Sequence, residues 1–164
     1  MFSQTDCNTN RITIYKARMA TIMVAIPVVS REDVVITLSI HLGYIPKGTK
    51  TLTPELMELI HNHLLPNEEF QSENYDDTED WIMNEDIVDT LINEAEKTSQ
   101  VKTRGLYLHE DDSTCHLLGC EVKDYRRHTL SSCDIQKVKD KINIKLLSFG
   151  FDTSELDVFF YKAD

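Results

Sequence analysis

The stretch Ser30-Arg-Glu-Asp-Val-Val-Ile-Thr-Leu-Ser-Ile-His-Leu-Gly43 decides the fold, because its pattern fits both a strand and a helix. Every second residue from Val34 to Leu42 is apolar, and the segment is rich in β-branched side chains. This period of two is typical of a half-buried strand. The alternative is a helix over residues 31–42, since Ser30 to Asp33 loosely fit a capping box and Gly43 stands where a helix would end. We take the strand as the first interpretation and keep the helix as its alternative.

The segments before this stretch also carry strand patterns. Residues 12–14 and 22–29 are rich in β-branched side chains, and Pro27 indicates an edge position or a bulge because proline has no N–H to donate within a sheet. Residues 1–10 are polar, and we expect a disordered leader there. Met19 is a plausible alternative start of translation.

A helix is predicted directly after the loop formed by residues 43–50. Thr53 is a favourable N-cap, and Pro54 suits the first helical position because its φ angle is already helical. Apolar residues then recur at helical spacing until Pro66 and predict one buried stripe. This stripe consists of Leu56, Leu59, Ile60, His63 and Leu64. His63 is therefore expected on the inner face of the helix.

The second half of the chain supplies the remaining elements. They are a helix over 84–97 capped by Asn84, a hairpin of residues 101–109 and 114–123, a helix from Ser131 or Ser132 to Gly150, and a strand over 156–161. These elements do not alternate as regular βαβ units, which favours the α+β class. We predict one domain over residues 11–164, with an antiparallel or mixed sheet of about five to six strands and about three helices on one face. A sub-boundary near residue 98 is an open alternative.

Composition excludes several classes of protein. A chain of 164 residues with 41% hydrophobic content is typical of a single folded domain. Its four cysteines, Cys7, Cys115, Cys120 and Cys133, have an irregular spacing that does not fit a secreted disulfide framework. No apolar run approaches the roughly 20 residues of a membrane span, and no signal-peptide cleavage pattern follows the run that Pro27 interrupts. We therefore expect a cytoplasmic protein that does not bind membranes.

The strongest functional signal is an acidic segment from Lys50 to Lys97. Between these two lysines the segment has fourteen acidic residues and no lysine or arginine, whereas the remainder of the chain has 14 acids against all 17 bases. The formal net charge of −11 disfavours nucleic acid as a direct ligand and favours a basic protein. Residues 67–80 lack apolar periodicity, so we expect a solvated acidic loop there.

Three large aromatic residues lie among these carboxylates. Phe70, Tyr75 and Trp81 are unusual in a solvated loop, because aromatic side chains favour burial or contact with a partner. Trp81 is the only tryptophan, and tryptophan is a frequent anchor at protein interfaces. The predicted partner-binding surface therefore combines aromatic anchors with acidic residues. Its members are Glu68, Glu69, Phe70, Glu73, Tyr75, Asp76, Asp77, Glu79, Asp80, Trp81, Glu85, Asp86 and Asp89.

The charge and size of the chain suggest a class of function but no family. Antirestriction, anti-CRISPR, antitoxin and immunity proteins share this acidic profile, so we hypothesise a small acidic protein that engages and inhibits a basic, nucleic-acid-handling partner. Nucleic-acid mimicry is a sharper version of this hypothesis. Residues 85–96 carry five acids over about 16 Å of predicted helix, whereas duplex DNA carries one charge per about 1.7 Å. A single helix is thus too sparse to copy a duplex. A homodimer, or an acidic loop folded back on the helix, would come closer.

Two plainer interpretations of the acidic segment stay open. The carboxylates lie on solvated faces and keep the protein in solution, or basic residues between Arg126 and Lys145 neutralise some of them within the chain. A related alternative is a structural subunit or scaffold held by apolar contacts, whose association survives high salt.

A second candidate site lies in residues 109–133. Its weak zinc candidates are Cys115, Cys120, His128 and Cys133. The spacing of these cysteines misses the pairs two to four residues apart that zinc sites commonly use. Cys133 and His128 also form a conceivable nucleophile–base pair, yet no phosphate-binding loop or hydrolase motif accompanies them. We expect a non-enzymatic protein without a cofactor, with an enzyme or metalloprotein as the alternative.

Overall fold

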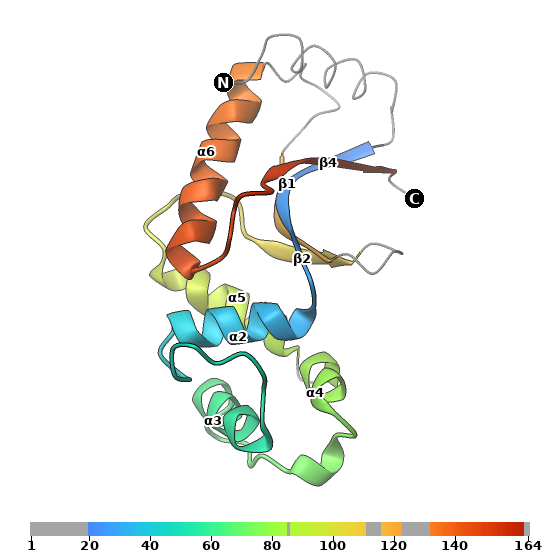
Figure 1. Ribbon diagram of the computed structural model, residues 1–164, viewed down its shortest axis with the longest axis vertical. Helices are drawn as coiled ribbons and strands as arrows, with labels where there is room; N and C mark the ends of the chain where they lie inside the picture. Colours follow the sequence, from blue (N-terminus) through green and yellow to red (C-terminus); the bar gives the residue numbers. More distant parts are fainter. Residues whose placement is uncertain (1–19, 85, 111–115, 123–131, 163–164) are drawn as a thin grey trace.

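The computed structural model describes residues 20–84, 86–110, 116–122 and 132–162, which form an α+β fold (Figure 1). One sheet has the strand order β2-β3-β1-β4, and all its neighbouring strands are antiparallel. The strands are β1 (Ala20–Val28), β2 (Tyr107–Glu110), β3 (His116–Glu121) and β4 (Asp157–Lys162). The helices are α2 (Arg31–His41), α3 (Pro54–Leu64), α4 (Thr78–Asn84), α5 (Ile87–Thr98), α6 (Ser132–Phe149) and the short 3₁₀ helix η1 (Ser72–Asn74).

The predicted class is confirmed, but the predicted numbers of elements are wrong for the described part of the chain. It contains four strands instead of five to six, and five α-helices instead of three. Residues 31–41 are helical, which adds one helix and removes one expected strand. The second additional helix is α4, which begins at Thr78, inside the segment expected to be a loop. Residues 1–10, and the strand expected over residues 12–14, lie outside the described residues.

Helix α2 corrects the strand interpretation of residues 31–42. Ser30 Oγ accepts a hydrogen bond from the backbone N–H of Asp33 at 3.2 Å and thereby caps the first turn. Its buried side chains include the sequence neighbours Val34 and Val35, which a strand would direct to opposite faces. Because α2 packs against β1, α4, α5 and α6, burial on several sides outweighs the β-branched character of the segment.

Strand β1 is central, with β3 on one side and β4 on the other. Its pairing with β4 ends at Ala25 opposite Asp157, whereas its pairing with β3 continues through Pro27 opposite Leu117. Pro27 therefore lies beyond the part of β1 that needs hydrogen bonds on both sides, which is where a residue without an N–H is tolerated. The expected edge-like environment is present, although the strand itself is internal.

Helices α2, α5 and α6 pack against the sheet. Ile22, Val24 and Ile26 of β1 belong to the main core together with residues of all the α-helices, whereas Met23 and Ala25 belong to a smaller apolar cluster on the opposite face. Figure 1 shows α6 alongside the sheet, α2 and α5 next to it, and α3 and α4 at the far end of the molecule. The part of the acidic segment that runs from α3 to α4 therefore forms the end that is remote from β4.

A buried ion pair joins α5 to α6. Lys145 is 1% exposed, and its Nζ donates to Glu96 Oε2 at 2.7 Å and to Thr103 Oγ1 at 3.1 Å. Glu96 Oε1 accepts a hydrogen bond from the backbone N–H of Leu106 at 3.1 Å. One carboxylate of the acidic segment is thus neutralised within the chain, as one of the plainer interpretations proposes.

The connection between α4 and α5 differs from the expected cap. Asn84 is the last residue of α4, and α5 begins at Ile87 after Asp86. Asp86 has φ 48°, in the left-handed region, and its side chain makes no capping hydrogen bond. This conformation is uncommon for a residue other than glycine, and aspartate is among the side chains that adopt it most readily. The helix predicted over residues 84–97 therefore forms as α5 from Ile87, and Asn84 ends α4 instead of capping this helix.

Candidate functional site

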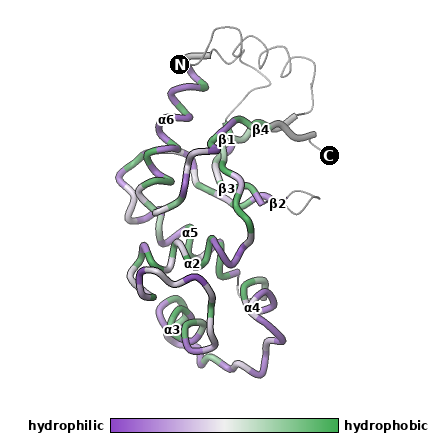
Figure 2. The backbone as a smooth tube through the Cα atoms, viewed as in Figure 1, coloured by the Kyte–Doolittle hydropathy of each residue, from purple (hydrophilic) through white to green (hydrophobic). Residues whose placement is uncertain are grey.

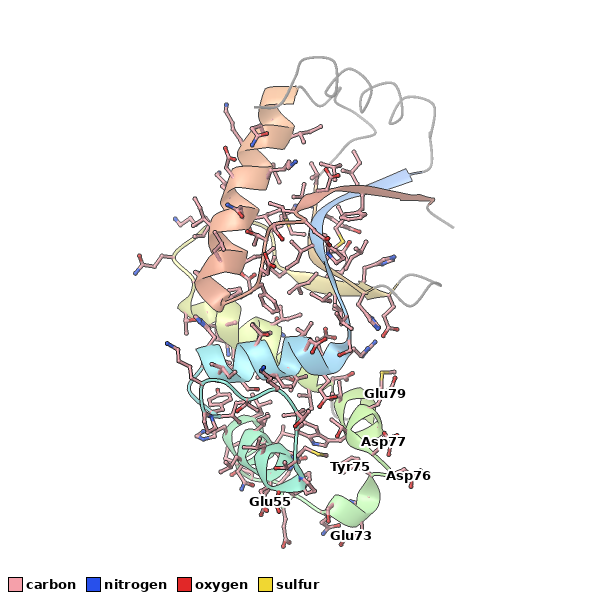
Figure 3. All side chains as sticks on the ribbon, viewed as in Figure 1. Glu55, Glu73, Tyr75, Asp76, Asp77 and Glu79 are labelled. Atoms are coloured by element: carbon pink, nitrogen blue, oxygen red, sulfur yellow. The ribbon has the colours of Figure 1, made fainter. Side chains whose placement is uncertain are left out.

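Eight exposed carboxylates gather at the end of the molecule formed by α3, η1 and α4 (Figure 3). We call them the acidic surface. They are Glu55, Glu58, Glu68, Glu69, Glu73, Asp76, Asp77 and Glu79. Within the described residues, none of these eight forms an ion pair with a lysine, arginine or histidine. Figure 2 shows that the chain joining α3 to α4 is largely hydrophilic.

Local hydrogen bonds hold the acidic surface in place. The pKa of Glu55 lies below its ordinary value, because its carboxylate accepts from its own backbone N–H and then from the Thr53 hydroxyl at the start of α3. At the start of α4, Asp77 Oδ1 accepts from the Asp80 backbone N–H at 2.8 Å, and Asp80 Oδ2 accepts from that of Asp76 at 3.1 Å. Carboxylates are favourable at these helix N-termini, where the dipole is positive.

The aromatic residues beneath this surface belong to the core. Trp81 is 0% exposed, while Phe70 and Tyr75 are half-buried and pack against the main core cluster. The Phe70 ring lies 6.4 Å from the Trp81 ring, edge to face, and 6.0 Å from the Tyr75 ring. A side chain that is already fully buried has no exposed area to offer a partner, so the expectation that Trp81 anchors a partner at the surface does not fit this structure.

Two exposed apolar side chains lie among the carboxylates instead. Leu59 of α3 is 45% exposed and Met83 of α4 is 49% exposed. Each follows a carboxylate of the acidic surface by four residues, Glu55 and Glu79 respectively, and so shares its side of the helix. The predicted apolar stripe places Leu59 inside, and no sequence signal distinguishes Met83.

The predicted burial of the two histidines of α3 is reversed in the structure. His61 is buried and His63 is exposed, where the His63 ring stacks on the Tyr44 ring at 4.4 Å. The inner face of α3 consists of Met57, Ile60 and His61, one residue away from the predicted stripe. Both ring nitrogens of His61 lack a hydrogen-bond partner among the described residues.

The other acidic candidates are dispersed. Asp86 and Asp89 are exposed near the start of α5, Asp80 is half-buried, and Glu85 lies outside the described residues. Glu94 pairs with Lys97 at 2.7 Å on the surface of α5. The structure therefore brings together α3, the α3–α4 connection and α4, and it does not unite the whole acidic segment on one surface.

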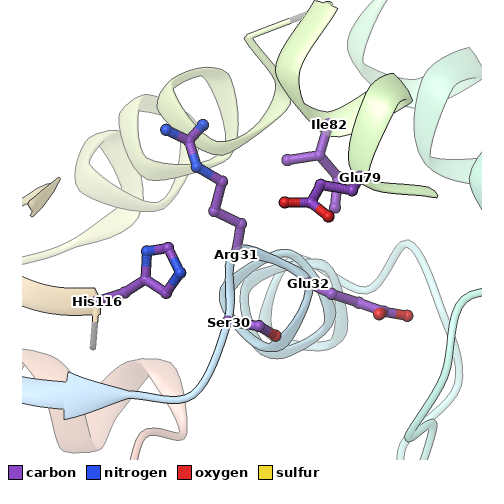
Figure 4. Close-up of a pocket in the computed structure, with 6 residues that line it drawn as sticks. All are labelled: Ser30, Arg31, Glu32, Glu79, Ile82 and His116. Carbon is purple, nitrogen blue, oxygen red and sulfur yellow. The ribbon is translucent and has the colours of Figure 1, made fainter. Parts of the chain in front are cut away.

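A small pocket borders the acidic surface (Figure 4). It has a volume of about 130 Å³, and its lining consists of Ser30, Arg31, Glu32, Glu79, Ile82 and His116. Arg31 Nε donates to Glu110 Oε1, and this hydrogen bond is the main reason why the pKa of Glu110 is lowered. Because the lining mixes both signs of charge and its arginine is already paired, the pocket does not select a ligand by charge.

The described part of the Cys/His region shows no metal centre. Among the described residues, no group of three or more His, Cys, Asp and Glu side chains could hold a metal ion. Cys120 is buried on β3, and desolvation raises the pKa of its thiol to about 11. Its thiolate, the form that attacks substrates and binds zinc, is therefore disfavoured near neutral pH. Cys115, His128 and the Cys133 side chain lie outside the described residues.

No protein-family model, curated protein or solved structure is significantly similar to this chain. Among the described helices, none combines the length and the apolar character that crossing a bilayer requires. The candidate site therefore rests on the geometry of the acidic surface itself.

Proposed function

We propose that this is a cytoplasmic binding protein whose acidic surface engages, and thereby inhibits, a basic protein that handles nucleic acid. The observation that carries the proposal is the set of eight exposed carboxylates at one end of the molecule, none of them ion-paired within the described residues. Like charges brought together in this way destabilise the fold slightly, and a cationic partner relieves their repulsion. No catalytic residue or cofactor belongs to this function.

The acidic surface favours fast, salt-sensitive association. Clustered charge steers an oppositely charged partner and accelerates encounter, and the effect declines as ions screen it. Leu59 and Met83 supply apolar area that a partner can desolvate, in the role that the sequence pattern assigns to Trp81. Neutralising the carboxylates should lower the association rate, whereas truncating Met83 should raise the dissociation rate.

Nucleic-acid mimicry is the sharper form of this proposal. A single helix carries too few charges to copy a duplex. The α3–α4 connection adds its carboxylates to those of two helices, which supports a denser anionic patch than any one helix provides. Competition between the protein and duplex DNA for the same partner would test this form directly.

An affinity experiment from a nuclease-treated lysate of the native host tests the proposal. The bait would be compared with a neutralised variant carrying Glu68→Gln, Glu69→Gln, Asp76→Asn and Asp77→Asn, in which the amide oxygen introduced by the last change can still cap α4. A matched control removes four exposed carboxylates elsewhere, with Glu121→Gln, Asp134→Asn, Asp140→Asn and Glu155→Gln. A basic nucleic-acid-binding protein retained by the wild type and the control, and lost by the neutralised variant, supports the proposal. Equal retention by all three contradicts it.

A subunit or scaffold function is the second candidate, and one observation favours it. Ile144 and Leu147 are exposed and lie three residues apart on α6, so they form an apolar patch on its outer side. Association through this patch should survive molar salt and should be lost in Leu147→Lys. A partner that the neutralised variant still retains at high salt would point to this function instead.

A further inference from the structure

Three buried polar atoms beneath the α3–α4 connection have no hydrogen-bond partner in the part of the chain that the structure describes. They are Nδ1 and Nε2 of His61 and Nε1 of Trp81. His61 is 2% exposed, and Trp81 is completely buried. Buried ring nitrogens normally form a hydrogen bond to a protein group or to water, so these three atoms can pair with a polar group that enters the space beside them.

One side chain covers both residues. The Phe70 ring lies 5.3 Å from the His61 ring and 6.4 Å from the Trp81 ring. A phenylalanine fills apolar space but offers no donor or acceptor to the three nitrogens. Phe70 is therefore an imperfect occupant of the space between α3 and α4.

The segment that carries Phe70 is weakly attached. In residues 66–76, the backbone N–H groups of Glu68, Asn74 and Tyr75 bond to carbonyls three residues earlier, and that of Asp76 bonds to Asp80. Among the described residues, no backbone–backbone hydrogen bond joins this segment to α2, α5 or the sheet. Segments held by a few side-chain contacts open at a lower free energy than the core.

The charge of the segment also favours opening. Residues 66–76 carry Glu68, Glu69, Glu73 and Asp76, which are half of the acidic surface. Their mutual repulsion acts against the closed arrangement, and the open arrangement leaves the same carboxylates accessible to the cationic groups of a partner. Charge and packing thus point to the same partner: a basic segment that also carries an aromatic residue.

We propose that residues 66–76 are a lid whose Phe70 occupies a binding site for an aromatic side chain, and that a tyrosine of the basic partner replaces Phe70 there. This inference rests on the proposed function and adds the chemistry of the partner. Tyrosine fits better than phenylalanine because its hydroxyl both donates and accepts, as the Trp81 N–H and the His61 nitrogens require. The lid closes the site in the free protein and opens when the partner binds.

Trp81 is the only tryptophan, so tryptophan fluorescence comes from this one buried position next to Phe70. We expect Phe70→Ala to increase acrylamide quenching of Trp81 severalfold while the far-UV circular dichroism is retained. Phe159→Ala, a half-buried aromatic residue on the opposite face of the sheet, is the matched control and should leave the quenching unchanged. Equal quenching of the wild type and Phe70→Ala overturns the lid.

If Phe70→Ala does not fold, hydrogen exchange of the wild type decides instead. The amides of Glu68, Asn74 and Tyr75 should exchange well before those of Ile60 and Ile82 in the flanking helices. Exchange of both groups only through global unfolding overturns the lid.

Peptide titrations test the site separately from the acidic surface. The probes are acetyl-KKYKK-amide, acetyl-KKFKK-amide and acetyl-KKAKK-amide, followed by Trp81 fluorescence excited at a wavelength that tyrosine does not absorb. We expect the tyrosine peptide to bind severalfold more tightly than the alanine peptide, with phenylalanine between them. Equal binding of all three overturns the aromatic site but leaves electrostatic docking intact. If no peptide changes the fluorescence, the site is overturned as well, and the affinity experiment then judges the proposed function alone.

Discussion

Lys145 Nζ lies 2.7 Å from Glu96 Oε2, in the buried contact between α6 and α5. Lysine is seldom buried unless it is paired, and here the hydroxyl of Thr103 accepts a second hydrogen bond from the same ammonium group. Glu96 in turn holds the backbone N–H of Leu106, just before β2. This pair therefore ties two helices and the start of a strand to one point of the core.

We expect Glu96→Gln to lower the free energy of unfolding by about 3 kcal/mol, because it leaves the buried ammonium of Lys145 without a counter-charge. The double variant Glu96→Leu with Lys145→Met should recover most of this loss, because no buried charge remains unpaired. Urea unfolding measures both. The surface pair Glu94–Lys97 supplies the control, since Lys97→Met should leave the stability nearly unchanged. If the stability loss of the double variant equalled the sum of the losses of its two single substitutions, Glu96 and Lys145 would not be coupled.

Replacement of His61 by leucine should stabilise the protein. The substitution removes two buried nitrogens without a partner, each of which costs about 1 kcal/mol or more, and leucine has a similar volume. Thermal or urea unfolding gives the sign, and His63→Leu at the exposed position is the control. A loss of stability in His61→Leu would show that the ring nitrogens are satisfied. A gain in stability with weaker binding of the tyrosine peptide is the pattern expected where function opposes stability.

Gly119→Ala should disrupt the sheet. A Cβ at this position would lie 2.1 Å from the carbonyl oxygen of Val24 and 2.6 Å from the Cα of Ala25, both on the neighbouring strand β1. Backbone cannot yield as a flexible side chain does, so we expect a loss of about 3 kcal/mol or more, at the upper end for single substitutions. Gly105→Ala is the control, because a Cβ there meets nothing within 4 Å. Equal melting temperatures for the two variants would refute the steric account.

Cys120 should resist alkylation in the folded protein and react after unfolding. Burial raises the pKa of its thiol to about 11, and only the thiolate is a good nucleophile. The raised folded value means that stability from this group is present below the unfolded pKa of about 8.5 and is lost as the pH rises from there toward 11. Iodoacetamide labelling at pH 8, with the modified peptide identified by mass spectrometry, measures the reactivity. Cys120→Ser should lose less stability than the wild type between pH 8 and 10.

Part of the fold follows from local chemistry. Thr53 and Pro54 begin α3 as predicted, because a cap hydroxyl and a fixed φ angle act within one turn of chain. Gly150 ends α6 with φ 96°, and the N–H groups of Gly150 and Phe151 bond to carbonyls of the last turn. Strands β2 and β3 pair antiparallel as predicted, although β2 begins only at Tyr107 and not at residue 101. The final strand β4 forms within one residue of the predicted bounds.

The errors fall where two local patterns compete. The alternation from Val34 to Leu42 satisfies a strand, yet the same residues satisfy a helix once neighbours on several sides bury them. The predicted stripe on α3 is displaced by one residue, which is enough to exchange the places of His61 and His63. A helical face is defined only to within about one residue when the apolar positions are few.

Some features of the candidate site also follow from the sequence, and others follow only from the tertiary structure. Its charge is a property of composition, so the sequence by itself determined that a strongly acidic segment with three aromatic residues lies between Lys50 and Lys97. Only the tertiary structure decided that Glu96 turns inward to Lys145, that Trp81 is buried under Phe70, and that Leu59 and Met83 remain exposed beside the carboxylates. The physical reason is that charge and local capping depend on residues near in sequence, whereas burial depends on which distant elements the fold brings against each face.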